Sequence, residues 1–179
     1  MQRIVWRFGL ISGGIFALTF VVSMLFKEQL GFDNGAILGY AAMLVSFLMV
    51  YFGVRAYRDT ELNGSIRFGR AFGVGLLITL VGCAFYVASW EIVYFKFTPD
   101  FADKYAEAVV KKTKASGATP EKVAATQKEM DDFKVKYQNP LYNSAVTFME
   151  PFPIGLVMTL ISAGILSRRR RTGAVTSPA

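Results

Sequence analysis

The chain has 179 residues, of which 53% are hydrophobic and 15% aromatic, and only 18% are charged. Because soluble domains carry about 25% charged residues, this composition argues against a small soluble enzyme. The sequence has no His and a single Cys, Cys83. Histidine-based acid–base catalysis, histidine metal ligation and an internal disulfide are therefore excluded.

Four charge-free apolar stretches follow one another along the chain, at residues 8–26, 34–54, 71–90 and 151–167. As helices they reach about 25 to 32 Å, close to the roughly 30 Å hydrocarbon core of a bilayer. Lipid cannot hydrogen-bond a bare backbone, so each stretch is predicted to be a helix. We expect one all-α membrane domain over 1–179, with transmembrane helices at about 8–26, 35–54, 71–92 and 151–167.

The start of the fourth span has two solutions in the sequence. Pro151 and Pro153 fit the first turn of a helix, where a missing N–H is tolerated. A helix that begins near Pro140 and kinks at Pro151 fits the same residues. The spacing alone does not decide between them.

Arg and Lys are completely segregated along the chain. All ten Arg lie near the N-terminus, in the 55–70 loop or after the fourth span, and all ten Lys lie at Lys27 or within 96–136. Counted within about 15 residues of a membrane end, the positive-inside rule gives ten for the Arg side and four for the Lys side. Both termini, the 55–70 loop and the basic tail 168–179 are therefore predicted to be cytoplasmic. The tail starts with four expected topology anchors: Arg168, Arg169, Arg170 and Arg171.

The segment between the third and fourth spans is predicted to be an extracytoplasmic insertion, at 96–150, with two amphipathic helices. Each helix is expected to begin with a capping Thr, a Pro and an acid, at Thr98-Pro99-Asp100 and Thr119-Pro120-Glu121. Three placements are open: a cap packed on the membrane helices, which we favour, a position at the lipid interface, or a docking surface for a partner.

Two carboxylates are the candidate functional residues. Glu91 follows Trp90 and precedes apolar residues up to Phe95, so it lies at or just inside the outer interface if the helix continues. Glu150 is expected at the matching depth before the fourth helix. Ionisable residues at membrane depth are candidate ion or proton sites, and two acids at one level would share a cation or a proton. Alternatively, both mark helix ends in the headgroup zone, solvated or paired with Lys96.

Small residues at four-residue spacing are candidates for close helix packing in lipid. These pairs are Gly9–Gly13, Gly35–Gly39, Gly69–Gly73 and Ala71–Gly75. Packing within the monomer and association with another chain are both open for them.

The stretch from 53 to 82 reads GVRAYRDTELNGSIRFGRAFGVGLLITLVG. An apolar helix runs into Tyr57-Arg58-Asp59, an Asn-Gly turn follows, and Phe68-Gly69-Arg70-Ala71-Phe72 begins the next helix. Together with the polar insertion and the apolar run before a basic tail, this arrangement resembles the uncharacterised bacterial membrane-protein family called domain of unknown function 4199, over roughly residues 5–170. The resemblance implies a four-span protein of the bacterial cytoplasmic (inner) membrane and brings no activity or cofactor with it.

Two functions follow from these observations. The first is a non-enzymatic membrane protein that acts through association of its helices with a second copy or a membrane-protein partner. The alternative is a small oligomeric transporter or channel subunit that uses Glu91 and Glu150 as a cation or proton site. Without His, GxGxxG or GxxxxGK, no enzymatic activity, metal or cofactor is expected. The lipid bilayer is the expected surrounding, and nucleic acid is not an expected partner because Arg after an apolar span anchors topology.

Overall fold

The structure is a computed structural model that describes residues 1–168, with the backbone alone for residues 27–33. Within this part the chain forms helices and no strand. The helices, in chain order, are α1 (Gln2–Leu25), α2 (Lys27–Glu61), α3 (Phe68–Phe97), α4 (Phe101–Ala115), α5 (Pro120–Tyr137), α6 (Pro140–Met149) and α7 (Pro151–Leu166).

Four helical segments are long and apolar enough to cross a membrane, namely Gln2–Leu25, Asn34–Glu61, Phe68–Phe97 and Pro140–Leu166. The predicted all-α class with four membrane-spanning helices is confirmed at this level. Each segment is longer than its charge-free run. Charged side chains at a helix end are tolerated because they extend toward water while their backbone stays helical.

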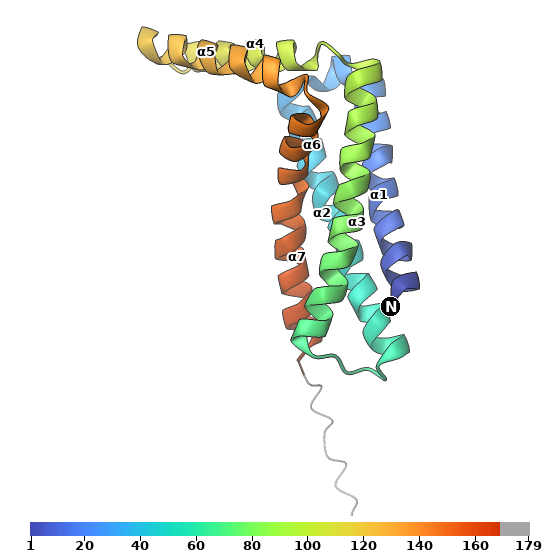
Figure 1. Ribbon diagram of the computed structural model, residues 1–179. Coiled ribbons are helices and arrows are strands. Elements are labelled where there is room, and N and C mark those ends of the chain that lie inside the picture. Colours follow the sequence, from blue (N-terminus) through green and yellow to red (C-terminus); the bar gives the residue numbers. More distant parts are fainter. Residues whose placement is uncertain (169–179) are drawn as a thin grey trace, which may run out of the picture.

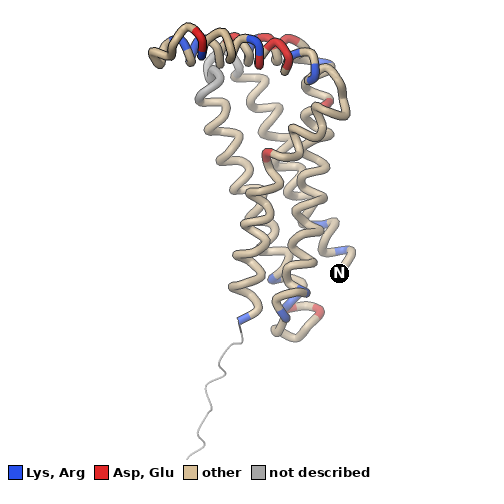
Figure 2. Tube along the Cα trace, turned by 60° about the vertical axis from the view of Figure 1, so that its left-hand side comes forward, with Lys and Arg blue, Asp and Glu red and all other residues tan. Residues whose placement is uncertain are grey.

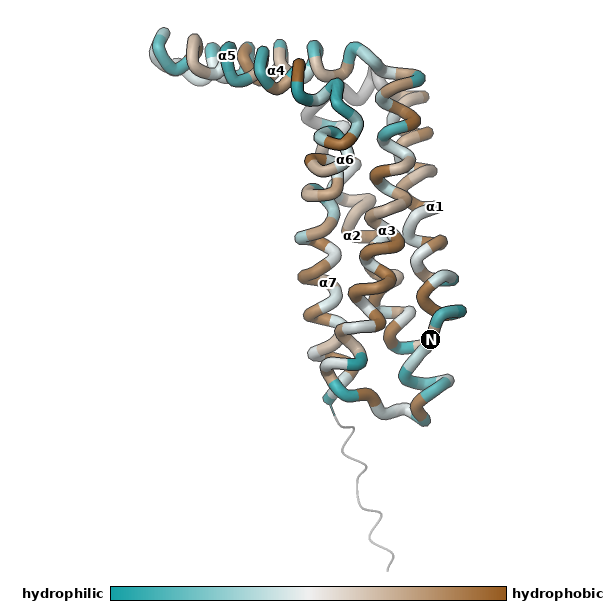
Figure 3. Tube along the Cα trace, in the orientation of Figure 1, coloured by the Kyte–Doolittle hydropathy of each residue, from teal (hydrophilic) through white to brown (hydrophobic). Residues whose placement is uncertain are grey.

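The long helices stand side by side as a bundle with α3 at its centre (Figure 1). Helix α3 packs on α1, α2, α6 and α7. Large buried side chains, among them Phe16, Phe47 and Ile78, fill the space between the helices. The hydropathy of the chain is highest along the middle of this bundle and lowest at its ends (Figure 3).

The fourth span is two helices placed end to end. Asn139 caps α6, since its Oδ1 accepts a hydrogen bond from the backbone N–H of Leu141 at 2.9 Å. Helix α6 ends at Met149, and α7 begins at Pro151, which has no N–H to continue the helical ladder. Of the two solutions, the structure therefore has the start at Pro140 with a break at Pro151.

The connection between α2 and α3 is a tight turn. Asn63 and Gly64 have φ angles of 52° and 84°, a left-handed conformation that these two residue types adopt most easily. The Gly64 N–H donates to the Arg58 carbonyl at 3.0 Å. The expected Asn-Gly turn is confirmed, and it is shorter than the predicted 55–70 loop because α2 continues to Glu61.

Helices α4 and α5 form an antiparallel hairpin, which we call the arm. The arm leaves one end of the bundle and projects sideways, roughly at right angles to the bundle axis (Figure 1). Helix α4 packs on α5, and α5 reaches the bundle through α6. The favoured prediction of a cap packed over the membrane helices is therefore wrong, because the hairpin extends beyond them.

The two predicted caps of the arm have different outcomes. Thr119 caps α5 as predicted, since its Oγ1 accepts from the Lys122 N–H at 3.3 Å. Thr98 instead ends α3, where its hydroxyl donates to the Val93 carbonyl at 3.3 Å. The reason is Pro99, which disfavours helical backbone at the preceding residue and forces α3 to stop there.

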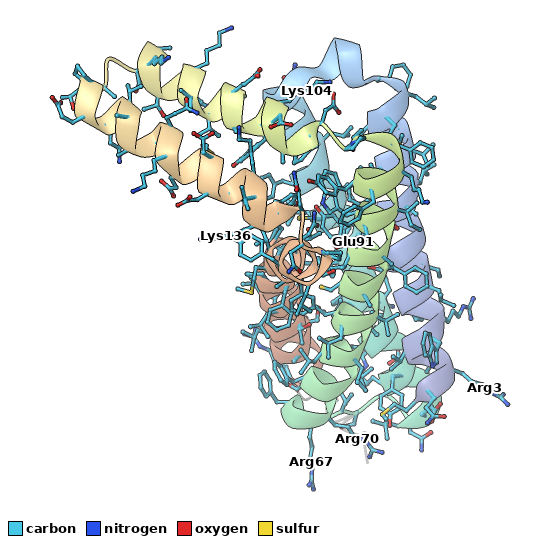
Figure 4. The ribbon with its side chains drawn as sticks, turned by 45° about the horizontal axis from the view of Figure 1, so that its top comes forward. Arg3, Arg67, Arg70, Glu91, Lys104 and Lys136 are labelled. Atoms are coloured by element: carbon cyan, nitrogen blue, oxygen red, sulfur yellow. The ribbon has the colours of Figure 1, made fainter. Side chains whose placement is uncertain are left out.

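Charged residues gather at the two ends of the molecule and are sparse in between (Figure 2). Arg3, Arg67 and Arg70 lie at one end, which we call the Arg end, and Lys104 and Lys136 lie at the opposite Lys end (Figure 4). Segregation along the sequence is thus segregation between two ends of the bundle. Arg168 follows α7, and the anchors Arg169, Arg170 and Arg171 lie outside the described residues.

Candidate functional site

Glu91 lies on α3 at the Lys end, close to where the arm joins the bundle (Figure 4). Its side chain is half-buried, and its Oε1 accepts a hydrogen bond of 2.7 Å from the Ser144 hydroxyl on α6. The helix that carries Glu91 continues to Phe97. Glu91 is therefore a residue within the third helix, as its apolar surroundings predicted.

Glu150 lies at the break between α6 and α7 and is exposed. Its Oε2 accepts a 2.8 Å hydrogen bond from the Tyr86 hydroxyl on α3. Tyr86 and Glu91 are five residues apart on α3, which is a rise of about 8 Å along the helix axis. Glu150 is therefore held from an earlier turn of α3 than the one that carries Glu91. Each acid is held by a hydroxyl from the facing helix.

A cluster of aromatic side chains connects the arm to the bundle, and we call it the aromatic joint. The Trp90 Nε1 donates to the Tyr137 hydroxyl at 2.9 Å. The Trp90 and Phe101 ring centroids lie 4.7 Å apart, and those of Tyr94 and Tyr137 lie 5.2 Å apart. Burial raises the pKa of the Tyr137 phenol above its ordinary value of 10.0. Phe133 also belongs to the joint, and its ring centroid lies 4.7 Å from that of Tyr137.

Asn143 on α6 is a buried polar residue that the sequence analysis did not single out. Its Nδ2 donates to the Tyr137 carbonyl at 3.3 Å, and its Oδ1 accepts from the Thr147 hydroxyl at 3.2 Å. The first bond ties the last turn of the arm to α6, and the second holds the Asn143 amide within α6. An Asn inside an otherwise apolar stretch was the available signal, because a buried amide needs partners.

Two hydroxyl pairs are buried in the middle of the bundle. The Ser12 and Ser46 oxygens are 2.6 Å apart across α1 and α2. The Thr79 and Thr159 oxygens are 2.9 Å apart across α3 and α7. Polar side chains between membrane helices contribute to their association. Both pairs lay within spans that were predicted only as apolar helices, and the Ser and Thr within those spans were the missed signal.

The predicted small-residue pairs divide into two groups. A Cβ added at Gly9 would stand 2.5 Å from Val81, and one at Gly13 would stand 2.6 Å from Phe85. Gly9 and Gly13 are therefore used for packing α1 against α3. The pair Ala71–Gly75 is also used for packing within the monomer. Ala71 is fully buried, and a Cβ added at Gly75 would lie 3.0 Å from Thr159.

The other predicted pairs have open space at their Cβ positions. No described atom stands within 4 Å of a Cβ added at Gly35, Gly39, Gly69 or Gly73. Three glycines outside the predicted pairs make close contacts instead. A Cβ at Gly53 would lie 2.4 Å from the Ile78 Cδ1, one at Gly82 would lie 2.8 Å from the Ser12 hydroxyl, and one at Gly155 would lie 2.4 Å from the Thr79 methyl group.

Acidic and sulfur-containing side chains do not gather in the described part of the chain. No three of its Asp, Glu or Cys residues come close enough to hold a metal ion together. The thiol of Cys83 is buried in α3. Two surface pockets in the described part of the chain lie on the arm, and Lys114 and Gln127 line both of them.

The fold defines the class of protein. Four apolar helices of membrane-spanning length, with charged residues at both ends of their bundle, are those of a multi-pass membrane protein. The chain belongs to the family described as "Protein of unknown function (DUF4199)", whose family model matches residues 7–168. The resemblance seen in the sequence is thereby confirmed. No curated protein and no solved structure matches the chain.

Proposed function

We propose that this protein is a non-enzymatic, multi-pass protein of the bacterial cytoplasmic membrane that acts through association of its helices with a second copy or a membrane-protein partner. In this proposal the Arg end and both termini face the cytoplasm, and the arm lies outside. The positive-inside rule supports the orientation, because Arg3, Arg67 and Arg70 gather at one end of the bundle. The absence of His supports a role without catalysis.

The observation that carries the proposal is the unused glycine face of α2. Gly9, Gly13 and Gly75 are enclosed by neighbouring helices, whereas Gly35 and Gly39 have no described atom within 4 Å of their Cβ positions. Small residues allow two helix backbones to approach closely, and this approach drives association in lipid. The α2 face therefore fits a further helix from another chain.

Paired substitutions with a matched control test this proposal. The variant Gly35→Leu with Gly39→Leu fills the α2 face, and the control Gly69→Leu with Gly73→Leu fills an equally unpartnered pair on α3. We expect energy transfer between donor- and acceptor-labelled copies in vesicles, and the mobility of the native complex, to fall with the α2 variant only. A strictly monomeric, partnerless protein in native membranes would refute the proposal, as would equal effects of both variants.

Transport through a shared acidic site has less support than association. Glu91 and Glu150 each accept a hydrogen bond from a different hydroxyl. Tyr86, which holds Glu150, lies about 8 Å before Glu91 along α3. The two acids thus have separate partners, whereas a shared cation or proton needs both carboxylates at one point.

A further inference from the structure

The root of the arm lies at the level of the lipid headgroups. Helix α3 has 30 residues and is about 45 Å long, which equals the thickness of a bilayer with its headgroups. Its last turns still present apolar surface, since Ile92, Phe95 and Phe97 are exposed by 59%, 41% and 60%. The arm starts at Phe101, directly after this apolar surface. It is therefore not raised above the membrane on a polar stalk.

When the bundle crosses the membrane along its own axis, the arm runs parallel to the membrane plane and beyond the bundle. It stands roughly at right angles to the bundle axis, and both views show it projecting sideways from the same end of the bundle (Figures 1 and 2). Helix α4 has 15 residues and is about 22 Å long. The far end of the arm consequently lies above the lipids that surround the bundle.

The aromatic joint holds the arm in this direction. Trp90 and Tyr94 come from α3, Phe101 from α4, and Phe133 and Tyr137 from α5, so three helices meet in one cluster. Trp and Tyr rings prefer the headgroup level of a membrane, where one edge is apolar and the other polar. The joint therefore places the root of the arm at that depth and restrains its rotation.

Charge is distributed unequally along the arm. The tip, which we define as residues 111–122, contains four Lys and one acid, Glu121. The rest of the segment, residues 100–110 and 123–137, contains four Lys and six acids. Its Lys134 bridges the two helices, with Asp131 at 3.0 Å and Asp103 at 3.6 Å. The tip is thus net positive, while the part next to the bundle is net negative.

We propose that the arm lies on the membrane surface and that its lysine-rich tip binds the phosphate groups of anionic lipids. The root of the arm lies at headgroup depth, the arm runs along the membrane surface, and its tip is positively charged. These three features together place the tip lysines at the lipid phosphates. Each Lys close to an anionic surface favours the docked arm by about fivefold.

The test uses the full chain in vesicles, with a fluorophore on Ala118→Cys at the tip. The unsubstituted protein controls for labelling, because its Cys83 is buried. Quenching by a nitroxide on the lipid headgroup measures how close the tip is to the membrane, and it works for either orientation of the protein. Vesicles contain about 30 mol % phosphatidylglycerol or none, at a protein-to-lipid ratio that leaves the chains monomeric.

We expect strong headgroup quenching with phosphatidylglycerol and a loss of quenching at about 1 M salt, where the Debye length is near 3 Å. Replacing Lys111, Lys114 and Lys122 by Gln should lower the docked-to-undocked ratio about 100-fold. The same change at Lys96, Lys104 and Lys136 removes equal charge near the bundle, and its effect should be far smaller.

Three results would overturn the inference. The first is a tip that is not quenched in either lipid, which would mean that the arm stands in water. The second is an equal loss of quenching with both triple substitutions. The third is a tip whose protection depends on protein density and not on phosphatidylglycerol, which would mean that the arm binds another protein chain.

Discussion

Gly155 on α7 provides the sharpest test of the packing in this bundle. A Cβ placed there would lie 2.4 Å from the Thr79 methyl carbon and 2.9 Å from Phe47, against the 3.4 to 4 Å of ordinary contact. Thr79 and Phe47 are fully buried. Thr79 cannot turn away without losing its hydrogen bonds to Thr159 and to the Gly155 carbonyl, at 2.9 and 3.3 Å. The substitution Gly155→Ala must therefore separate the helix backbones.

The magnitude follows from two opposing effects. Overpacking a closed core costs about 1 to 3 kcal/mol, and Ala regains about 1 kcal/mol over Gly within a helix. We expect Gly155→Ala to destabilise the protein by up to about 2 kcal/mol. Gly164 on the same helix has no described atom within 4 Å of its Cβ position, so Gly164→Ala should be neutral or stabilising by up to about 1 kcal/mol.

Thermal unfolding in detergent micelles, followed by tryptophan fluorescence, measures this difference. Both variants gain the same helix propensity, so they differ by the overpacking cost of about 1 to 3 kcal/mol. At about 2 to 4 °C per kcal/mol for a chain of this size, their Tm values should differ by roughly 2 to 12 °C. Adding Thr79→Ser to Gly155→Ala removes the nearest methyl group and keeps the hydroxyl, so it should restore part of the stability. Equal Tm values for the two alanine variants would refute the close approach of α3 and α7.

Two further predictions concern polar contacts. Ser12→Ala and Ser46→Ala should each destabilise the bundle by about 0.6 to 1.7 kcal/mol, and a double-mutant cycle should show that their effects are coupled because the two oxygens are 2.6 Å apart; additive effects would contradict the pair. In the arm, the hydrogen bond from Lys134 lowers the pKa of Asp131 below its ordinary value of 3.8. Its stabilising effect is present above that ordinary value and is lost as pH falls through the lowered pKa. An NMR titration of the arm should show this loss in the unsubstituted protein and not in Lys134→Gln.

Much of the fold was predictable because it depends on local properties of the sequence. Charge cannot enter the hydrocarbon core cheaply, so the charge-free runs mark the spans directly. The segregation of Arg from Lys predicted that both termini and the Asn63-Gly64 turn share one end of the bundle, and the structure agrees at Arg3, Arg67 and Arg70. Thr119 and Pro120 likewise marked the start of α5 through local capping.

The contacts between helices were not predictable in the same way. A helix in a membrane is apolar on its lipid-facing and its buried sides alike, so hydrophobic spacing does not reveal which side meets a neighbour. For this reason Gly9–Gly13 and Gly35–Gly39 looked equivalent in the sequence, although only the first pair is enclosed. The hydrogen-bond partners of Glu91 and Glu150 also depend on how α3 and α6 pack against each other. The spacing of residues along the chain does not predict this packing.

The sequence by itself determined how many times the chain can cross a membrane and where its charges lie, since both depend on the free energy of transferring each segment from water to lipid. Only the tertiary structure decided that the polar hairpin projects sideways from the bundle. That direction depends on the contacts of Trp90, Phe101 and Tyr137, which lie on three different helices and meet only when those helices pack together.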